Sequence, residues 1–180
     1  MLLVNTHQIN SIHEAYKAIH EINQATIRVW IETCLFTWQW WLGVGLTIVP
    51  WGIWFFLRKK DSKDRLLYAG FFIILIASWF DFAGVSLGLW SYNYILVPSI
   101  PAYIPWDFSL ILVTTMLLLQ YKPNVNPFIK AVFTGAMTAF VGEPIFKWIG
   151  LYNPQEWKYI YSFGIHVILY LMTHYMSRRK

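Results

Sequence analysis

Five apolar runs, each close to the length that crosses a bilayer, restrict the fold of this chain more than any other feature. A hydrocarbon core of about 30 Å needs roughly 20 apolar residues per helix. In lipid every backbone polar group must be bonded internally, which favours helices. The sequence therefore predicts an all-α integral membrane bundle. The predicted spans are Cys34–Leu57, Leu66–Leu89, Ile104–Tyr121, Phe128–Ile149 and Trp157–Met176.

The composition leaves little material for a surface that faces water. Charged residues make up 13% of the 180 residues, against about 25% in soluble domains. Hydrophobic residues make up 57% and aromatic residues 19%. No soluble shell is present to bury five such helices, so the predicted partner is the lipid bilayer. Nucleic-acid binding is not expected, because the basic residues are scattered over short loops.

Residues 1–33 differ from the predicted transmembrane domain, residues 34–180. Ser11 and Glu14 have the spacing of a capping box at a helix start. Apolar residues such as Ile12, Tyr16 and Ile19 recur at helical spacing, with charged residues on the other faces. This pattern predicts an amphipathic helix that is too polar to span. It lies on the outer membrane interface or over the bundle, or forms a plain soluble cap.

The distribution of lysine and arginine predicts the orientation, because cytoplasmic loops carry an excess of these residues. The opposite loops, residues 91–103 and 153–156, contain neither lysine nor arginine. We therefore expect a multi-pass protein of the cell membrane with its N-terminus outside and its C-terminus in the cytoplasm. Ten of the fourteen basic residues fall on the predicted cytoplasmic side: Arg58, Lys59, Lys60, Lys63, Arg65, Lys122, Lys130, Arg178, Arg179 and Lys180.

Three carboxylates and a histidine lie within the predicted spans, where ionisable side chains are costly and by default mark function. Counted along their helices, Asp81, Asp107 and Glu143 fall in the outer half of the bilayer on three different spans. His166 falls near the midplane, just below them. The sequence therefore predicts that these four side chains converge on one polar site, in which Pro144 kinks the fourth span beside Glu143.

Each of these residues also has a structural interpretation. Glu143 and Lys147 stand at i and i+4 and can neutralise each other. Asp107 follows Pro105 near a helix start, where an acid can cap free amides. His166 can be a satisfied core histidine. Asp81 has no basic neighbour within a helical turn or two, so it needs a proton, a partner from another helix, or a ligand.

A short internal repeat links two of the carboxylates. Six residues separate Asp81 from Gly88-Leu89-Trp90, and six residues separate Glu143 from Gly150-Leu151-Tyr152. The spacing predicts two hairpins of parallel orientation, related by an axis along the membrane normal, as in some transporters. Gly84 and Gly88 also form a GxxxG pair, which favours the close approach of another helix.

The motif order resembles a family of uncharacterised small multi-pass membrane proteins of spore-forming Gram-positive bacteria. The motifs are TWQWW, DFAGVSLGLWSY, VPSIPAYIPWD, MLLLQY, VGEP, GLY and EWKYIYSF, and they cover nearly the whole chain from Trp30 onward. The resemblance implies a set of defining positions without naming their role: Asp81, Trp90, Tyr92, Pro105, Asp107, Glu143 and Pro144.

A second likeness is to the integral-membrane lycopene cyclase domains. It rests on Gly88-x-Trp90-x-Tyr92 followed by Pro105-Trp106-Asp107. Those domains have paired carboxylates after the proline and protonate a polyene, whereas this chain has one acid there. The likeness implies an apolar, lipid-like ligand.

Three functions from different classes fit these residues. The first is a module that binds or senses an amphiphile or a cation, and its predicted ligand-binding residues are Asp81, Asp107, Glu143, His166, Trp90 and Tyr92. The second is a structural membrane protein with internal salt bridges. The third is an enzyme that acts on a lipid or isoprenoid by general acid–base chemistry. No metal site is predicted, because HExxH-type spacing is missing, and no cofactor motif is identified.

Overall fold

The computed structural model describes residues 6–100 and 102–178, with side chains from residue 11 onward. Arg179 and Lys180, two of the basic residues used to predict the orientation, lie outside this part of the chain. The described chain is mostly helical, as the sequence predicts. In order it contains α1 (Thr6–Thr33), α2 (Trp38–Leu57), η1 (Lys60–Ser62), α3 (Lys63–Ser86), β1 (Ser91–Tyr92), η2 (Trp106–Leu110), α4 (Ile111–Gln120), α5 (Pro127–Met137), η3 (Thr138–Gly142), α6 (Glu143–Trp148), β2 (Tyr152–Asn153) and α7 (Tyr159–Ser177).

Three of the helices are long and apolar enough to cross a membrane: Trp38–Leu57, Lys60–Ser86 and Pro127–Trp148. The other two predicted spans also form helices. The third is the shorter apolar helix Trp106–Gln120, and Ile104 and Pro105 directly before it are helical too. The fifth, α7, carries polar residues such as Ser162 and His166 that reduce its apolar character.

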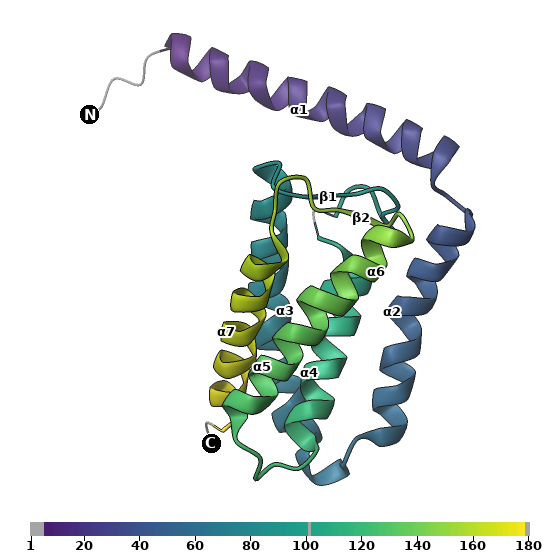
Figure 1. Ribbon diagram of the computed structural model, residues 1–180. Coiled ribbons are helices and arrows are strands. Elements are labelled where there is room, and N and C mark those ends of the chain that lie inside the picture. Colours follow the sequence, from purple (N-terminus) through teal and green to yellow (C-terminus); the bar gives the residue numbers. More distant parts are fainter. Residues whose placement is uncertain (1–5, 101, 179–180) are drawn as a thin grey trace.

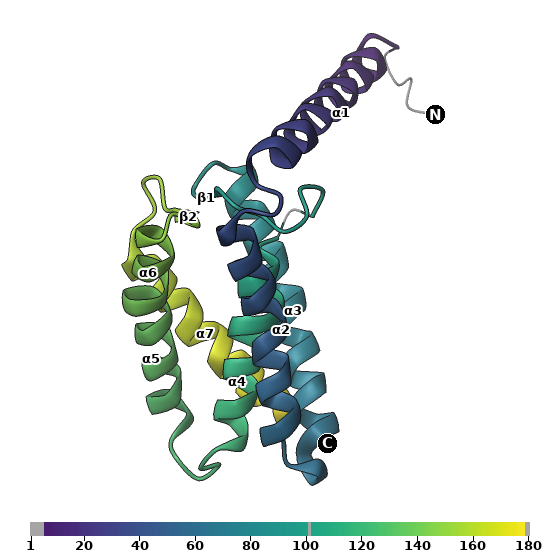
Figure 2. The ribbon, with the colours of Figure 1, turned by 90° about the vertical axis from the view of Figure 1, so that its right-hand side faces the viewer.

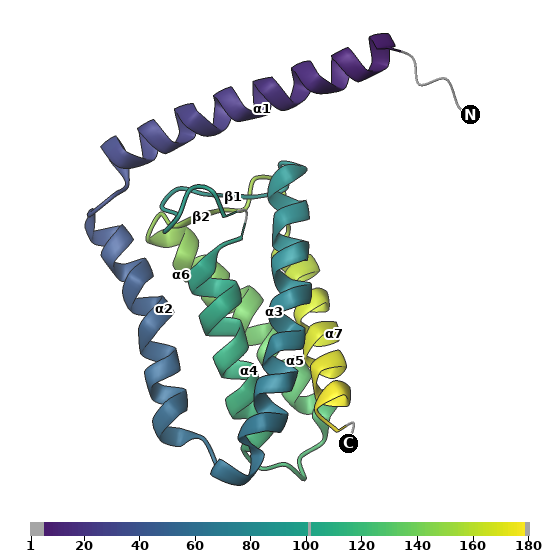
Figure 3. The ribbon, with the colours of Figure 1, turned by 180° about the vertical axis from the view of Figure 1, so that it is seen from behind.

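The helices form a bundle in which α7 packs against α3 and α5, and α4 packs against α2 and α3. Figures 1 and 3 show β1 and β2 across one end of this bundle and the C-terminus at the other. A buried apolar cluster joins the helices along the bundle, with Leu66, Leu112, Met116 and Ala131 among its members. A second cluster lies at the β1–β2 end and is largely aromatic.

Helix α1 lies apart from the bundle. Figure 2 shows it rising away from the end that carries β1 and β2. Its apolar residues Ile12, Tyr16 and Ile19 are exposed, so the predicted amphipathic stripe is not covered by the bundle. Near the end of the helix, Trp30 Nε1 donates to the Ile95 carbonyl at 2.7 Å, and the buried Cys34 Sγ lies 3.5 Å from the same oxygen.

The two segments of the predicted repeat adopt the same local geometry. Gly88 and Gly150 have φ values of +70° and +79°, a conformation that glycine adopts at low cost and that ends helices. One residue later, Leu89 N donates to Gly84 O and Leu151 N donates to Phe146 O, both at 2.9 Å. The same 6→1 hydrogen bond therefore closes α3 and α6.

The strands that follow these glycines pair with each other. β1 and β2 are antiparallel, and Ser91 lies opposite Asn153. Both residues stand three positions after their glycine, so these two equivalent positions face each other. This register is the one produced by an approximate two-fold axis that passes between the strands at the end of the bundle.

The predicted kink at Pro144 takes the form of a wider helical turn. The segment before it, Thr138–Gly142, is π-helical, and Glu143 N donates to Thr138 O. Pro144 has no N–H to continue the ordinary ladder, which favours a local change of hydrogen-bond register. A second π-helical turn, Trp106–Leu110, follows Pro105 and contains Asp107. Two of the three carboxylates that the sequence predicts within spans thus lie in or next to a π-helical turn.

The GxxxG pair does not serve the contact predicted for it. Gly88 is a helix terminator, and Gly84 faces the indole ring of Trp90 rather than another helix backbone. A Cβ atom on Gly84 would lie 2.0 Å from two carbons of that ring. The glycine therefore makes room for Trp90, which reaches back along α3 from the loop.

We expect Gly84→Ala to lower the free energy of unfolding by about 1–3 kcal/mol, because the added methyl group forces Trp90 out of its site. Gly45→Ala on α2 is the matched control, since nothing lies within 4 Å of a Cβ there. Thermal unfolding of the purified variants measures the effect. A Gly84→Ala midpoint equal to that of Gly45→Ala would contradict the assigned packing.

Candidate functional site

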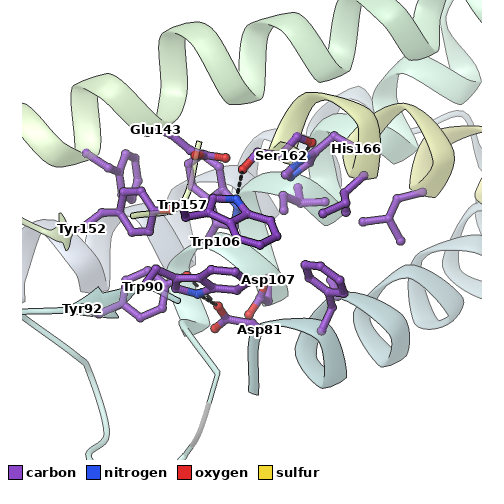
Figure 4. Close-up of a pocket in the computed structure, with 16 residues that line it drawn as sticks. Asp81, Trp90, Tyr92, Trp106, Asp107, Glu143, Tyr152, Trp157, Ser162 and His166 are labelled. Carbon is purple, nitrogen blue, oxygen red and sulfur yellow. Dashed lines mark hydrogen bonds between the residues drawn. The ribbon is translucent and has the colours of Figure 1, made fainter. Parts of the chain in front are cut away.

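A cavity of about 70 Å³ lies at the β1–β2 end of the bundle. Residues from α3, η2, α4, α6 and α7 line it, together with residues of the two loops that carry the strands. Figure 4 shows the polar side chains of these elements directed toward a common centre between aromatic rings. All six side chains predicted as ligand-binding lie in its lining: Asp81, Trp90, Tyr92, Asp107, Glu143 and His166.

Asp81 is 5% exposed and has partners from the loop that follows its own helix. Trp90 Nε1 and Tyr92 OH each donate to Oδ1 at 2.7 Å, and the Tyr103 amide donates to Oδ2 at 2.8 Å. Both oxygen atoms of the buried carboxylate therefore have hydrogen-bond donors. The partner that the sequence requires for Asp81 is therefore a set of hydrogen-bond donors from the loop between α3 and η2.

Tyr92 belongs to this network as a permanent donor. Burial, and next the charge of Asp81, raise the pKa of the Tyr92 phenol well above its usual value. The phenol therefore keeps its proton and continues to donate to Asp81. Its ring also stacks on Tyr103, with centroids 4.3 Å apart. Together these contacts fix the loop above the cavity.

Asp107 lies beside Asp81, and the two carboxyl groups interact directly. Asp107 is 3% exposed, and its Oδ2 atom has no hydrogen-bond partner among the described residues. Asp107 lies in the first turns of a helix that begins at Ile104, and its carboxyl group also interacts with the backbone of Tyr103, just before that helix. Two adjacent carboxylates repel each other unless a proton or a cation lies near them.

Glu143 is 7% exposed and points into the bundle beside Ser162. Its Oε2 atom has no hydrogen-bond partner among the described residues. Lys147 is exposed at the surface of α6, and within the described chain the two side chains form no ion pair. The neutralising pair that their spacing allows is absent because Glu143 turns inward while Lys147 remains outside.

His166 lies one helical turn after Ser162 on α7. Its Nδ1 is 2.8 Å from the Ser162 carbonyl oxygen. A carbonyl can only accept, so Nδ1 carries a proton and the neutral ring presents Nε2 as an acceptor. This Nε2 atom is buried and has no partner among the described residues. His166 is thus satisfied on one side and free on the side of the cavity.

Aromatic rings form most of the remaining wall. Trp90 lies 4.9 Å from Trp157 and 5.9 Å from Phe80 between ring centroids, and Trp106 lies 4.8 Å from Phe146. Trp157 Nε1 donates to Ser162 Oγ at 2.9 Å. Trp90, Trp106 and Trp157 therefore line the cavity.

Sequence reasoning missed several lining residues. Tyr152 occupies the repeat position of Trp90, which is a usable indication that it faces the same site. Phe80 and Phe146 had no such indication, because an aromatic residue in an apolar helix has no pattern that separates a lining position from one facing lipid.

The lining of the cavity has acidic side chains without basic ones to balance them. It includes three carboxylates and no lysine or arginine. No group of three or more histidine, cysteine, aspartate or glutamate side chains in the described chain is arranged to hold a metal ion. The lining offers hydrogen-bond acceptors and aromatic faces to a ligand.

Comparisons of this chain with protein-family models, with curated proteins and with solved structures found no match.

We expect Asp81→Asn to lower the free energy of unfolding by about 1–3 kcal/mol, because one amide N–H₂ then faces donors that need an acceptor. Asp64→Asn, at an exposed position of the same helix, is the matched control. Denaturation of both variants in the same detergent measures the difference. If both variants unfold at the wild-type midpoint, Asp81 does not hold the loop.

Proposed function

We propose that this protein spans the membrane and binds the cationic group of a ligand in the cavity between α3, η2, α6 and α7. The observation that supports this most directly is the unbalanced charge of the lining. Asp107 and Glu143 are almost fully buried, and each has an oxygen atom without a partner in the described chain. A buried carboxylate of this kind needs a counter-charge or a proton.

Aromatic faces strengthen the preference for a cation. The negative face of an indole ring attracts an ammonium group, and tryptophan is the best of the aromatic residues for this contact. Trp90, Trp106 and Trp157 all line the cavity. A cationic group placed there gains from both the carboxylates and the rings, whereas an anion is repelled by both.

The structural alternative requires the buried acids to be paired internally. Asp81 meets this description, because loop donors satisfy it. Asp107 and Glu143 do not, since neither has a basic partner among the described residues. A purely structural role therefore accounts for Asp81 and leaves one buried oxygen atom of each of the other two without a partner in the described chain.

The proposed topology has all five predicted spans crossing the bilayer, with the cavity in the outer half. The β1–β2 end is then outside with the N-terminus, and the C-terminus is cytoplasmic. The α2–α3 and α4–α5 connections, which contain Arg58, Lys60 and Lys122, lie at the other end. This arrangement agrees with the excess of basic residues in cytoplasmic loops. Helix α1 then lies at the outer surface with its apolar stripe toward lipid.

Cysteine labelling tests this topology. In a Cys34→Ser background, a membrane-impermeant maleimide added to intact cells should label Ser99→Cys, in the exposed β1–η2 loop. It should label Asn124→Cys, in the exposed α4–α5 loop, only after permeabilisation. Labelling of both positions in intact cells, or the reverse pattern, would contradict the orientation.

Ligand-induced thermal stabilisation tests the binding proposal. In phosphatidylcholine nanodiscs, we expect hexylammonium or hexyltrimethylammonium to raise the unfolding midpoint in a saturable way, while neutral hexanol does not. Glu143→Gln should weaken this binding by about 30-fold or more, because it removes a buried charged partner. Glu156→Gln, an exposed loop acid, should behave as the wild type. Equal shifts by the cations and by hexanol would rule the proposal out.

A further inference from the structure

The unpartnered atoms of the cavity are all of one kind. Asp107 Oδ2 and Glu143 Oε2 are carboxyl oxygens, and His166 Nε2 is the acceptor nitrogen of a ring whose other nitrogen donates to Ser162 O. All three are buried and have no hydrogen-bond partner in the described chain. A ligand that satisfies them must bring N–H or O–H donors together with positive charge.

A primary ammonium group has this combination, because it carries one positive charge and three N–H donors and has no acceptor. A quaternary ammonium group can also make cation–π contacts with the aromatic rings, but it has no N–H group and would leave the three acceptors without a hydrogen-bond donor. The cost of a buried acceptor without a donor then separates the two kinds of head group.

The wall between α3 and α7 indicates how such a group reaches the cavity. Phe80 lines the cavity and is also 41% exposed on the outer surface of the bundle. It contacts Trp90 and Trp157, with ring centroids 5.9 Å and 6.5 Å away. Both indoles are fixed by hydrogen bonds, Trp90 to Asp81 and Trp157 to Ser162. Phe80 is held by apolar contacts alone, so it is the member of this wall that moves most easily.

The size of the cavity sets a limit on what it encloses. About 70 Å³ is room for about five water-sized groups, at the roughly 10–15 Å³ that each requires. An ammonium group and its first carbons fit, but a long chain does not. The outer surface next to Phe80 is apolar, with Trp79 and Tyr161 exposed, so a chain that passes Phe80 reaches lipid.

We propose that the ligand is an amphiphile with a primary ammonium head group, which enters from the bilayer between α3 and α7. Its ammonium group lies among Asp107, Glu143 and His166, and its chain leaves past Phe80. This inference rests on the proposed function, of which it specifies the ligand class and the route. The same head group occurs on single-chain amines and on phosphatidylethanolamine, and the two sources share this chemistry.

The head group is tested by comparing decylammonium with decyltrimethylammonium in phosphatidylcholine nanodiscs, where no lipid head group carries an N–H donor. We expect the primary amine to bind about tenfold more tightly or better, since the trimethyl head group loses charge-assisted hydrogen bonds. Equal binding of the two would overturn the primary-ammonium assignment while leaving cation binding intact. Binding by neither, with no response to the hexyl cations, would overturn the proposed function itself.

The route is tested by chain length and by Phe80. With concentrations expressed per lipid, decylammonium should bind within about threefold of hexylammonium, because the additional methylenes remain in lipid in both states. A closed cavity predicts instead a steep loss of affinity with the longer chain, and that result would overturn the lateral route. Phe80→Ala should accelerate the association of decylammonium, while Trp79→Ala, an exposed neighbour outside the lining, should leave it unchanged.

Replacing part of the phosphatidylcholine with phosphatidylethanolamine separates the two sources. If phosphatidylethanolamine competes with decylammonium in the wild type but not in Glu143→Gln, the occupant is a lipid head group. If phosphatidylethanolamine does not compete while decylammonium still binds, the occupant is a single-chain amine. Competition that persists unchanged in Glu143→Gln would contradict the placement of the ammonium group beside this carboxylate.

Discussion

The carboxylate of Asp81 accepts hydrogen bonds from an indole, a phenol and a backbone amide, all from the loop that follows its helix. A buried anion without these donors would be expensive in an apolar bundle, so the loop and the acid must be ordered together. Because Trp90 is held in this way against Gly84, the indole becomes one wall of the cavity. The same hydrogen bonds close the end of the bundle above it.

The rest of the site follows from a repeated construction. Each half of the chain brings a helix to the same end, terminates it with a glycine of positive φ, and adds two residues to a shared antiparallel pair. The second helix of each half then begins beneath this pair. Asp107 lies in a π-helical turn and Glu143 directly follows one. Both side chains point toward the region between the two halves. A cavity lined by acids therefore forms close to the axis that relates the two halves.

The sequence was sufficient to predict the helical class, the boundaries of the apolar helices within a few residues, and which ionisable side chains line one cavity. Long-range hydrophobicity and positions along a helix carry this information. It was not sufficient to predict hydrogen-bond partners. No sequence pattern near Asp81 shows that it accepts a hydrogen bond from the amide of Tyr103, 22 positions away. Likewise, no pattern near Gly84 shows that it faces an indole ring instead of another helix.

The spacing of Glu143 and Lys147 illustrates the same limit. At i and i+4 on an isolated helix the two side chains are neighbours, but the bundle turns one inward and leaves the other at the surface. Sequence spacing predicts which residues share a face of a helix, but the packing of that helix in the bundle determines which of these side chains are in contact.

The buried polar groups of the site are of two kinds, those whose hydrogen-bonding atoms all have partners and those with an atom that has none. Asp81 has all the donors that a structural anion needs, and replacing it should damage the loop. Asp107, Glu143 and His166 each retain an unpartnered buried atom in the part of the chain that the structure describes. Folding alone gives no reason to keep acceptors in this state, since apolar residues of similar size would cost less to bury. In the proposed function a ligand from outside the chain completes them, and for this reason we assign the binding role to these three residues rather than to Asp81.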